Sequence, residues 1–155
     1  MAGAFAIRED DLAGEPTQAL LRLHLEGMHA HSPPGAVFAL DLSGLKQPEI
    51  TVWSAWNGER IAAIGALKAL DARHGEIKSM RTHPDFLRQG AGVAILAHII
   101  AVARSRGMTR LSLETGSGPA FEPALALYRR SGFVPGEAFG AYEKSPFNQF
   151  LTRAI

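Results

Sequence analysis

The segment at 50–70 is the sequence feature that most restricts the fold of this chain. It reads ITVWSAW, then Asn57-Gly58, then ERIAAIGALKAL, so two apolar stretches flank a turn signal. Asn and Gly both tolerate the positive φ of a two-residue type I′ turn, which predicts an antiparallel hairpin with strands at 50–56 and 60–70. The segment GEIKSMRT at 75–82 extends this hairpin into a meander of three strands. An antiparallel meander here excludes a fold built wholly from repeated parallel βαβ units.

Helical and extended patterns alternate along the rest of the chain. Apolar residues with helical spacing, together with proline and glycine at the ends, predict helices at 16–31, in the second half of 80–107 and at 119–132. Further strands are expected at 4–8, 110–116, 140–145 and 148–155, and an irregular connection with one short strand at 31–49. We therefore predict an α+β (mixed α/β) fold in one domain spanning 1–155.

The composition excludes several classes of function. The chain has no cysteine, which removes disulfides, zinc–thiolate sites and thiol nucleophiles. Its net charge is only +1, so it has no general attraction to nucleic acid or to an anionic membrane. His24, His29 and His31 lie close in sequence but lack a matching carboxylate, so no metal site is expected. The N-terminus has no basic region followed by an apolar one, and no stretch is apolar enough to span a membrane, which predicts a cytoplasmic location.

The segment MRTHPDFLRQGAGVAILAHIIAVARSRG at 80–107 contains two glycines at the start of a long apolar helix. Glycine is a poor helix former, so another requirement must favour Gly90 and Gly92. The first turn of a helix exposes unpaired N–H groups and a partial positive charge, and residues without side chains let an anion approach them. With Arg88 beside them, these glycines predict a site for a diphosphate, although a plain helix entry explains the same residues.

Two motifs in this order resemble the GNAT superfamily of acetyl-coenzyme A-dependent N-acetyltransferases. The first is LRQGAG at 87–92, which is similar to the family's [QR]-x-x-G-x-[GA] except that Leu87 replaces Gln or Arg. The second is ALALYRRSGF at 124–133, which is similar to A-x-x-L-Y-x-x-x-G-F with one residue fewer between Ala and Tyr. Phe121 stands where many members carry an Asn that binds the cofactor. The resemblance covers nearly the whole chain and implies a mixed, mostly antiparallel sheet of about six or seven strands flanked by about four helices.

The resemblance also implies how acetyl-CoA, the co-substrate, binds. The backbone at the end of the third meander strand would pair with the pantetheine arm, as an added strand does; the residues concerned are Met80, Arg81 and Thr82. The phosphates would be held by main-chain N–H groups of the helix entry, from Arg88, Gln89, Gly90, Ala91, Gly92 and Val93. The Arg81 side chain is a candidate for binding a substrate carboxylate, or a solvated surface charge. No metal is implied.

Acetyl transfer needs a neutral amine and a proton for the leaving thiolate. The resemblance implies that Tyr128 donates this proton, the alternative being a tyrosine that only packs in the core. Glu76, eleven positions before Leu87, is the candidate base, because this spacing resembles that of the base glutamate in the histone-acetylating branch of the family. It is otherwise an exposed strand residue or a partner of Lys78. Glu114 and Thr115 follow at the end of the 110–116 strand as candidate substrate-binding residues, and Glu114 is an alternative base.

We therefore expect an N-acetyltransferase that acts on a primary amine of a small metabolite through a ternary complex, without a covalent enzyme intermediate. One alternative is acetylation of a protein N-terminus or lysine, which predicts an open groove for a basic peptide. Another is a sensor that binds coenzyme A without turnover. The resemblance admits a homodimer, and neither nucleic acid nor membrane is an expected partner.

Overall fold

A computed structural model describes residues 5–155 and contains one sheet of seven strands in the order β1-β2-β3-β4-β5-β7-β6. The strands are β1 (Ala6–Glu9), β2 (Ile50–Asn57), β3 (Arg60–Ala69), β4 (His74–Thr82), β5 (Arg110–Thr115), β6 (Val134–Pro135) and β7 (Gln149–Ala154). All neighbouring strands are antiparallel except β4 and β5, which are parallel. The predicted α+β class and the mostly antiparallel sheet are confirmed. The first predicted strand began at residue 4, which lies outside the described residues.

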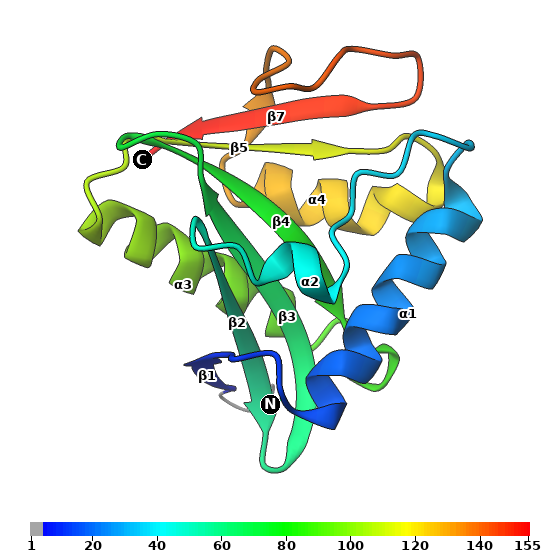
Figure 1. The fold of residues 1–155 in the computed structure, drawn as a ribbon, viewed down its shortest axis with the longest axis vertical. Coiled ribbons are helices and arrows are strands. Elements are labelled where there is room, and N and C mark those ends of the chain that lie inside the picture. The colour runs from blue at the N-terminus through cyan, green and yellow to red at the C-terminus, as the bar shows by residue number, and fades with distance from the viewer. Residues whose placement is uncertain (1–4) are drawn as a thin grey trace.

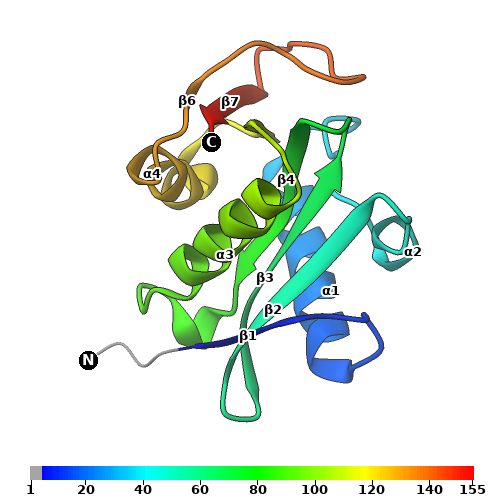
Figure 2. The same cartoon turned by 90° about the vertical axis from the view of Figure 1, so that its left-hand side faces the viewer.

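Four helices cover the two faces of the sheet. They are α1 (Glu15–His31), α2 (Leu42–Leu45), α3 (Ala91–Ser105) and α4 (Glu122–Arg130). Figures 1 and 2 show α3 and α4 on one face and α1 and α2 on the other. Within residues 5–155, no helix is both long and apolar enough to cross a bilayer.

The β2–β3 hairpin forms as predicted, but its turn lies one residue later. Asn57 pairs with Arg60, so the two turn residues are Gly58 and Glu59. Gly58 has φ +60°, whereas Asn57 and Glu59 are not in the positive-φ region. A glycine with positive φ at the first turn position is typical of a type II′ turn, not of the predicted type I′ turn.

The main core lies between the sheet and α3. The predicted apolar stripe of α3 is buried; it consists of Leu96, Ile99, Ile100 and Ala103. The helix approaches β3 at Gly65, where an added Cβ would lie 2.6 Å from Ile95 Cγ2. Gly65 therefore has no room for a side chain, and the close approach places the start of α3 beside the end of β4. Trp53 and Trp56 are also buried.

Three sequence predictions about connections were wrong. The segment 31–49 contains the short helix α2 instead of a strand, because the Asp41 side chain accepts a hydrogen bond from Gly44 N at 2.8 Å and caps a helical turn. The segment 140–145 is a loop, and the partner of β7 is the two-residue strand β6. The predicted helix at 119–132 begins as a 3₁₀ turn at Pro119–Phe121 and becomes α4 only at Glu122.

β4 and β5 separate soon after they begin. They pair only over three positions, from His74 with Arg110 to Glu76 with Ser112. Beyond Glu76 the two strands diverge, as Figure 1 shows, and the edge of β4 is left without β5 as a partner. Beyond Glu76, the β4 backbone groups on this edge therefore make no ladder hydrogen bonds with β5.

A β-bulge at Ser79 sets the side-chain directions of β4. Lys78 pairs with Ala66 and Arg81 with Ile64, so Ser79 and Met80 together lie opposite a single β3 residue. Ser79 has φ +56°, a conformation that a residue with a side chain rarely adopts. The bulge directs Lys78 and Arg81 to the same face although they are three positions apart.

Candidate active site

Three side chains form a buried polar cluster on the α1 face, where β4 leaves β5. The Lys78 ammonium lies 3.1 Å from Glu76 Oε2 and donates to Tyr142 Oη at 2.8 Å. The Tyr142 hydroxyl in turn donates to Glu76 Oε2. Only 4% of the Glu76 side chain and 9% of the Lys78 side chain are exposed. Of the two structural alternatives for Glu76, the structure therefore favours an ion-pair partner of Lys78 over an exposed strand residue.

Glu114 lies next to this cluster on β5. Its position is half-buried, and burial raises its pKa to about 7; the charge of Lys78 opposes this rise and the charge of Glu76 adds to it. In the part of the chain that the structure describes, no ion pair engages its carboxylate. Glu114 is thus an acid that can take up or release a proton near neutral pH.

Aromatic rings from two loops surround the polar cluster. Phe38, from the loop after α1, packs edge-on against Tyr142 with 5.3 Å between ring centroids. Tyr142 also contacts Phe139 at 5.1 Å and Phe150 at 5.9 Å. These contacts join the loop after α1 to the loop between β6 and β7 on the side of the sheet that carries Glu76. The Phe38–Tyr142 contact also accounts for the failed strand prediction at 140–145, because Tyr142 belongs to a loop that turns toward the cluster.

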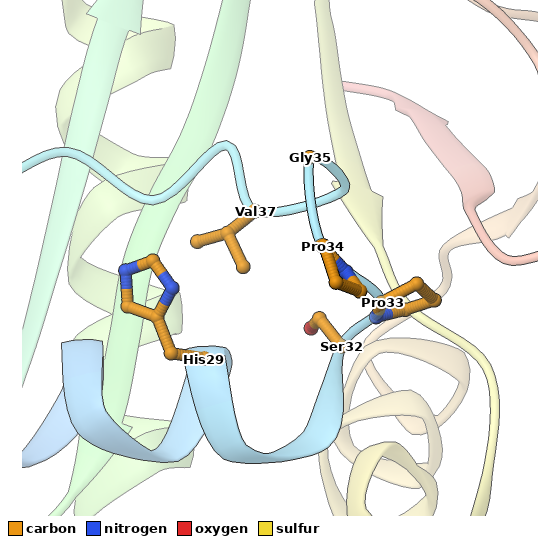
Figure 3. A pocket seen from close by; sticks show the side chains of 6 residues that line it. All are labelled: His29, Ser32, Pro33, Pro34, Gly35 and Val37. Atoms are coloured by element: carbon orange, nitrogen blue, oxygen red, sulfur yellow. The ribbon is translucent and has the colours of Figure 1, made fainter.

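A hollow of about 370 Å³ adjoins Phe38 along the chain. It is lined by the end of α1 and the following loop, namely His29, Ser32, Pro33, Pro34, Gly35 and Val37. Figure 3 shows the side chains of His29 and Val37 directed toward each other across this space. The Ser32 hydroxyl is buried and has no hydrogen-bond partner within residues 5–155. The hollow is large enough for part of a small ligand.

The start of α3, on the opposite face, has exposed backbone donors. The first intrahelical bond runs from Ala94 N to Gly90 O at 2.9 Å, so the N–H groups of Ala91, Gly92 and Val93 have no acceptor within the helix. Gly90 has φ +88°, and a Cβ there would meet no atom within 4 Å. Arg88 also has a positive φ, +61°. The geometry fits an anion such as a diphosphate.

Gly92 serves a different purpose from the one that the sequence suggested. A Cβ at Gly92 would lie 3.2 Å from Leu127 Cδ2 and 3.4 Å from Thr82 Oγ1. This glycine therefore allows α3 to pack closely against α4 and the end of β4. Only at Gly90 does the missing side chain leave open space at the helix entry.

The free edge of β4 runs through Met80 and Thr82 toward this helix entry. The side chain of Arg81 turns the other way, to α1, where Nε donates to His24 Nδ1 at 3.0 Å. The guanidinium is therefore half-buried, and the reading of Arg81 as a solvated surface charge was wrong. The Gln89 side chain folds back to the Asp85 carbonyl at 3.2 Å, so Gln89 would contribute to a phosphate site through its backbone.

Tyr128 lies on α4, on the same face as the start of α3. It is buried in the main core and packs edge-on against Phe133 at a centroid distance of 6.0 Å. Burial raises the pKa of Tyr128, so its hydroxyl remains protonated at neutral pH. Phe121, at the position where many relatives carry Asn, is buried against Phe147 at 5.5 Å and packs the loop after β6 onto the start of α4.

The structure brings together some of the expected residues and adds others. Glu76 and Glu114 meet on the α1 face, whereas Thr115, the next residue of β5, is buried and faces away from Glu114 because side chains alternate along a strand. Sequence reasoning noted Lys78 only as a partner for Glu76 and did not identify Tyr142. No local signal marks Tyr142, which is 66 positions from Glu76. Among residues 5–155, no three His, Asp or Glu side chains are grouped so as to hold a metal ion.

Comparisons with known proteins agree with this architecture. The family model described as the acetyltransferase (GNAT) family matches residues 17–133. The chain is 50% identical over 149 residues to the uncharacterized N-acetyltransferase YsnE of Bacillus subtilis, covering 96% of this chain and 99% of that protein. It is 47% identical over 151 residues to the uncharacterized N-acetyltransferase YedL of Escherichia coli, covering 97% and 95%.

A solved structure supports the same fold. A GNAT family acetyltransferase from Elizabethkingia anophelis, crystallised with acetyl-CoA bound, superimposes with a TM-score of 0.69 at 17% identity and covers 99% of both chains. At this identity the likeness concerns the fold alone. The family model and the two relatives establish more, because the model spans both motifs and the relatives cover 96% and 97% of this chain. This chain belongs to the GNAT family of acetyltransferases and is an acyltransferase.

Proposed function

We propose that this protein transfers the acetyl group of acetyl-CoA to a primary amine of a small metabolite, directly and within a ternary complex. The observation that carries the proposal is the separation of β4 from β5 beyond Glu76. A bare helix N-terminus and Tyr128 lie on one face of the sheet, and Glu114, which has no ion-pair partner among the described residues, lies on the other. An acyl donor and an acceptor amine can thus approach each other from opposite faces of the sheet.

The residues of the donor side fit acetyl-CoA. Bound acetyl-CoA would supply an acetyl group activated as a thioester. The backbone of Met80 and Thr82 would bind the pantetheine arm along the free edge of β4, and the N–H groups from Arg88 to Val93 would hold the phosphates. The open space at Gly90 supports this assignment. The bound acetyl-CoA of the Elizabethkingia anophelis structure supports it by analogy.

On the acceptor side, Glu114 is the residue best suited to take the proton of the acceptor ammonium. A general base works best when its pKa lies near the working pH, and the pKa of Glu114 is about 7. Glu76, the base expected from the sequence, already accepts from Lys78 and Tyr142. We therefore assign proton removal to Glu114, directly or through a water molecule, and assign to Glu76 the positioning of Lys78 and Tyr142.

The leaving sulfur needs a proton as the C–S bond breaks and the new C–N bond forms. The Tyr128 hydroxyl would donate this proton, because burial keeps it protonated. With no cysteine in the chain, a thiol-linked acetyl-enzyme has no residue on which to form. The ammonium loses two protons as it becomes an amide. Glu114 takes the first and later releases it to solvent, and the second restores the proton that Tyr128 gives to the sulfur.

The contact between Phe38 and Tyr142 favours a small acceptor over a protein. A peptide acceptor needs an open groove, whereas this contact joins the two loops over the polar cluster. The test is thiol release from acetyl-CoA with amino acids, arylalkyl amines and polyamines as acceptors. At least one small amine should be acetylated, and Glu26→Gln, a change at an exposed site on α1, should leave its turnover unchanged. Tight coenzyme A binding without thiol release for any amine would instead indicate a non-catalytic sensor.

A further inference from the structure

Lys78 is a buried cation that the proposed reaction does not use. Its ammonium has one carboxylate partner, Glu76 Oε2 at 3.1 Å, and one hydroxyl partner, Tyr142 Oη at 2.8 Å. Because the Tyr142 hydroxyl donates back to the same carboxylate oxygen, the three groups close a triangle. Glu76 and Lys78 therefore cancel each other's charge inside the acceptor side of the site.

The same ammonium also lies at the hydroxyl edge of the Tyr142 ring. Lys78 Nζ is 2.8 Å from Tyr142 Oη and 5.5 Å from the ring centroid, which places it beyond the hydroxyl group and not over the ring face. The Glu76 carboxylate, which would attract a positive charge, is thus already engaged by the protein's own lysine. A substrate cation placed there would meet a like charge without a counter-ion.

Glu114 is the remaining acid of this site, and it can balance a single ammonium. We propose that Lys78 is a specificity-determining residue that restricts the acceptor to amines with one positive charge and disfavours diamines and polyamines. This inference rests on the proposed function. The exposed Phe38 ring and the half-buried Phe139 ring beside Tyr142 offer an apolar surface to the uncharged body of such a monoamine.

Pentylamine and cadaverine test this proposal, because they share one unbranched carbon chain and differ in the second ammonium group. Their dissociation constants are measured by calorimetry on the full chain loaded with coenzyme A, so the result does not depend on turnover. The parent protein should bind pentylamine at least about tenfold more tightly than cadaverine, since a buried charge without a partner is costly. Lys78→Met should shift this ratio toward cadaverine by about tenfold or more, because Glu76 then lacks its cation.

Two further variants separate charge from shape. Lys78→Arg keeps the positive charge and should keep the parent's ratio. The double variant Glu76→Gln/Lys78→Met removes both charges and should also return to the parent's ratio. Lys78→Gln, whose amide keeps a donor for Glu76, is measured beside Lys78→Met, so that misfolding of the methionine variant leaves a neutral variant to compare.

Several results would overturn the proposal: equal affinity of the parent for the two amines, no binding of pentylamine, or the parent's ratio in both neutral single variants. Thiol release from acetyl-CoA with pentylamine is measured separately. A protein that binds the amines with the expected ratio but releases no thiol would contradict the proposed function and not the role of Lys78 in charge selection.

Discussion

The Nε–H of Arg81 donates a hydrogen bond to Nδ1 of His24 at 3.0 Å and so ties the middle of α1 to the end of β4. The same guanidinium donates to the His24 carbonyl at 3.4 Å. Because Arg81 can only donate, His24 must be neutral with its proton on Nε2. Gly27, one turn farther along α1, leaves the room this contact needs, since a Cβ there would lie 2.8 Å from the guanidinium.

This contact predicts a loss of stability in acid. Burial, and next the charge of Arg81, lower the pKa of His24 from 6.5 to about 4. Between these values the unfolded chain binds a proton that the folded chain does not, so stability falls as pH drops from about 6.5 toward 4. His24→Gln keeps an acceptor for Arg81 and should remove on the order of 2 kcal/mol of this pH dependence in urea unfolding. His31→Gln, at an exposed position, is the control, and an equal effect there would contradict the assignment.

Glu114 should set the acidic limb of the pH–rate profile. With a pKa of about 7, its carboxyl must lose its proton before it can accept one from the acceptor, so kcat/KM should rise as pH increases through about 7. Glu114→Gln should lower kcat by about 10² or more and abolish this limb. Glu76→Gln should leave the limb in place. The reverse pattern would return the role of base to Glu76.

Replacement of Glu114 should stabilise the protein at alkaline pH. The raised pKa means that the folded chain keeps a proton between about 4.5 and 7 that the unfolded chain releases, so this contribution to stability is lost as pH rises through 7. Glu114→Gln should therefore unfold at a higher temperature than the parent at pH 8, by about 3 °C after allowance for solvent screening. At pH 4 the two proteins should melt together. A destabilised variant at pH 8 would show that the carboxylate is well compensated in the folded state.

Tyr128→Phe tests the proton donor. Removal of the hydroxyl should lower kcat by about 10² with little change in the KM for acetyl-CoA, because the ring still packs against Phe133. Steady-state kinetics and the melting temperature are both measured. Unchanged kcat would leave Tyr128 with a packing role only.

The two glycines of the helix entry should respond differently to substitution. Gly90→Ala should cost about 1 kcal/mol of stability because its φ of +88° disfavours any side chain, although the Cβ meets no atom. Gly92→Val should disturb the packing of Leu127 and Thr82 and weaken coenzyme A binding by at least about tenfold, whereas Gly92→Ala should be tolerated better. Calorimetric titration with coenzyme A checks the binding. Parent-like affinity in Gly90→Val, whose side chain would enter the open space at the helix entry, would contradict the donor site there.

Short-range patterns predicted most of the regular elements. The two apolar stretches flanking Asn57-Gly58 indicated the hairpin, and the stripe that includes Leu96 and Ile99 indicated the long helix. The turn nevertheless lies one residue later than predicted, because Asn57 remains in the strand and pairs with Arg60. The predicted strand at 140–145 failed because Tyr142 packs against Phe38 and Phe150, contacts that alternation within the segment does not reveal.

The sequence by itself determined the meander, the helix with its bare N-terminus and two motifs resembling one acetyltransferase family, because each depends on residues within a few turns or strand positions. Only the tertiary structure shows that, among the described residues, Glu76 has an ion-pair partner and Glu114 has none. Strand alternation already places Lys78 on the same face as Glu76, but a loop far along the chain, which no local rule marks, brings Tyr142 to both residues. Charge pairing acts through space, so the division of roles between Glu76 and Glu114 could not be read from their spacing.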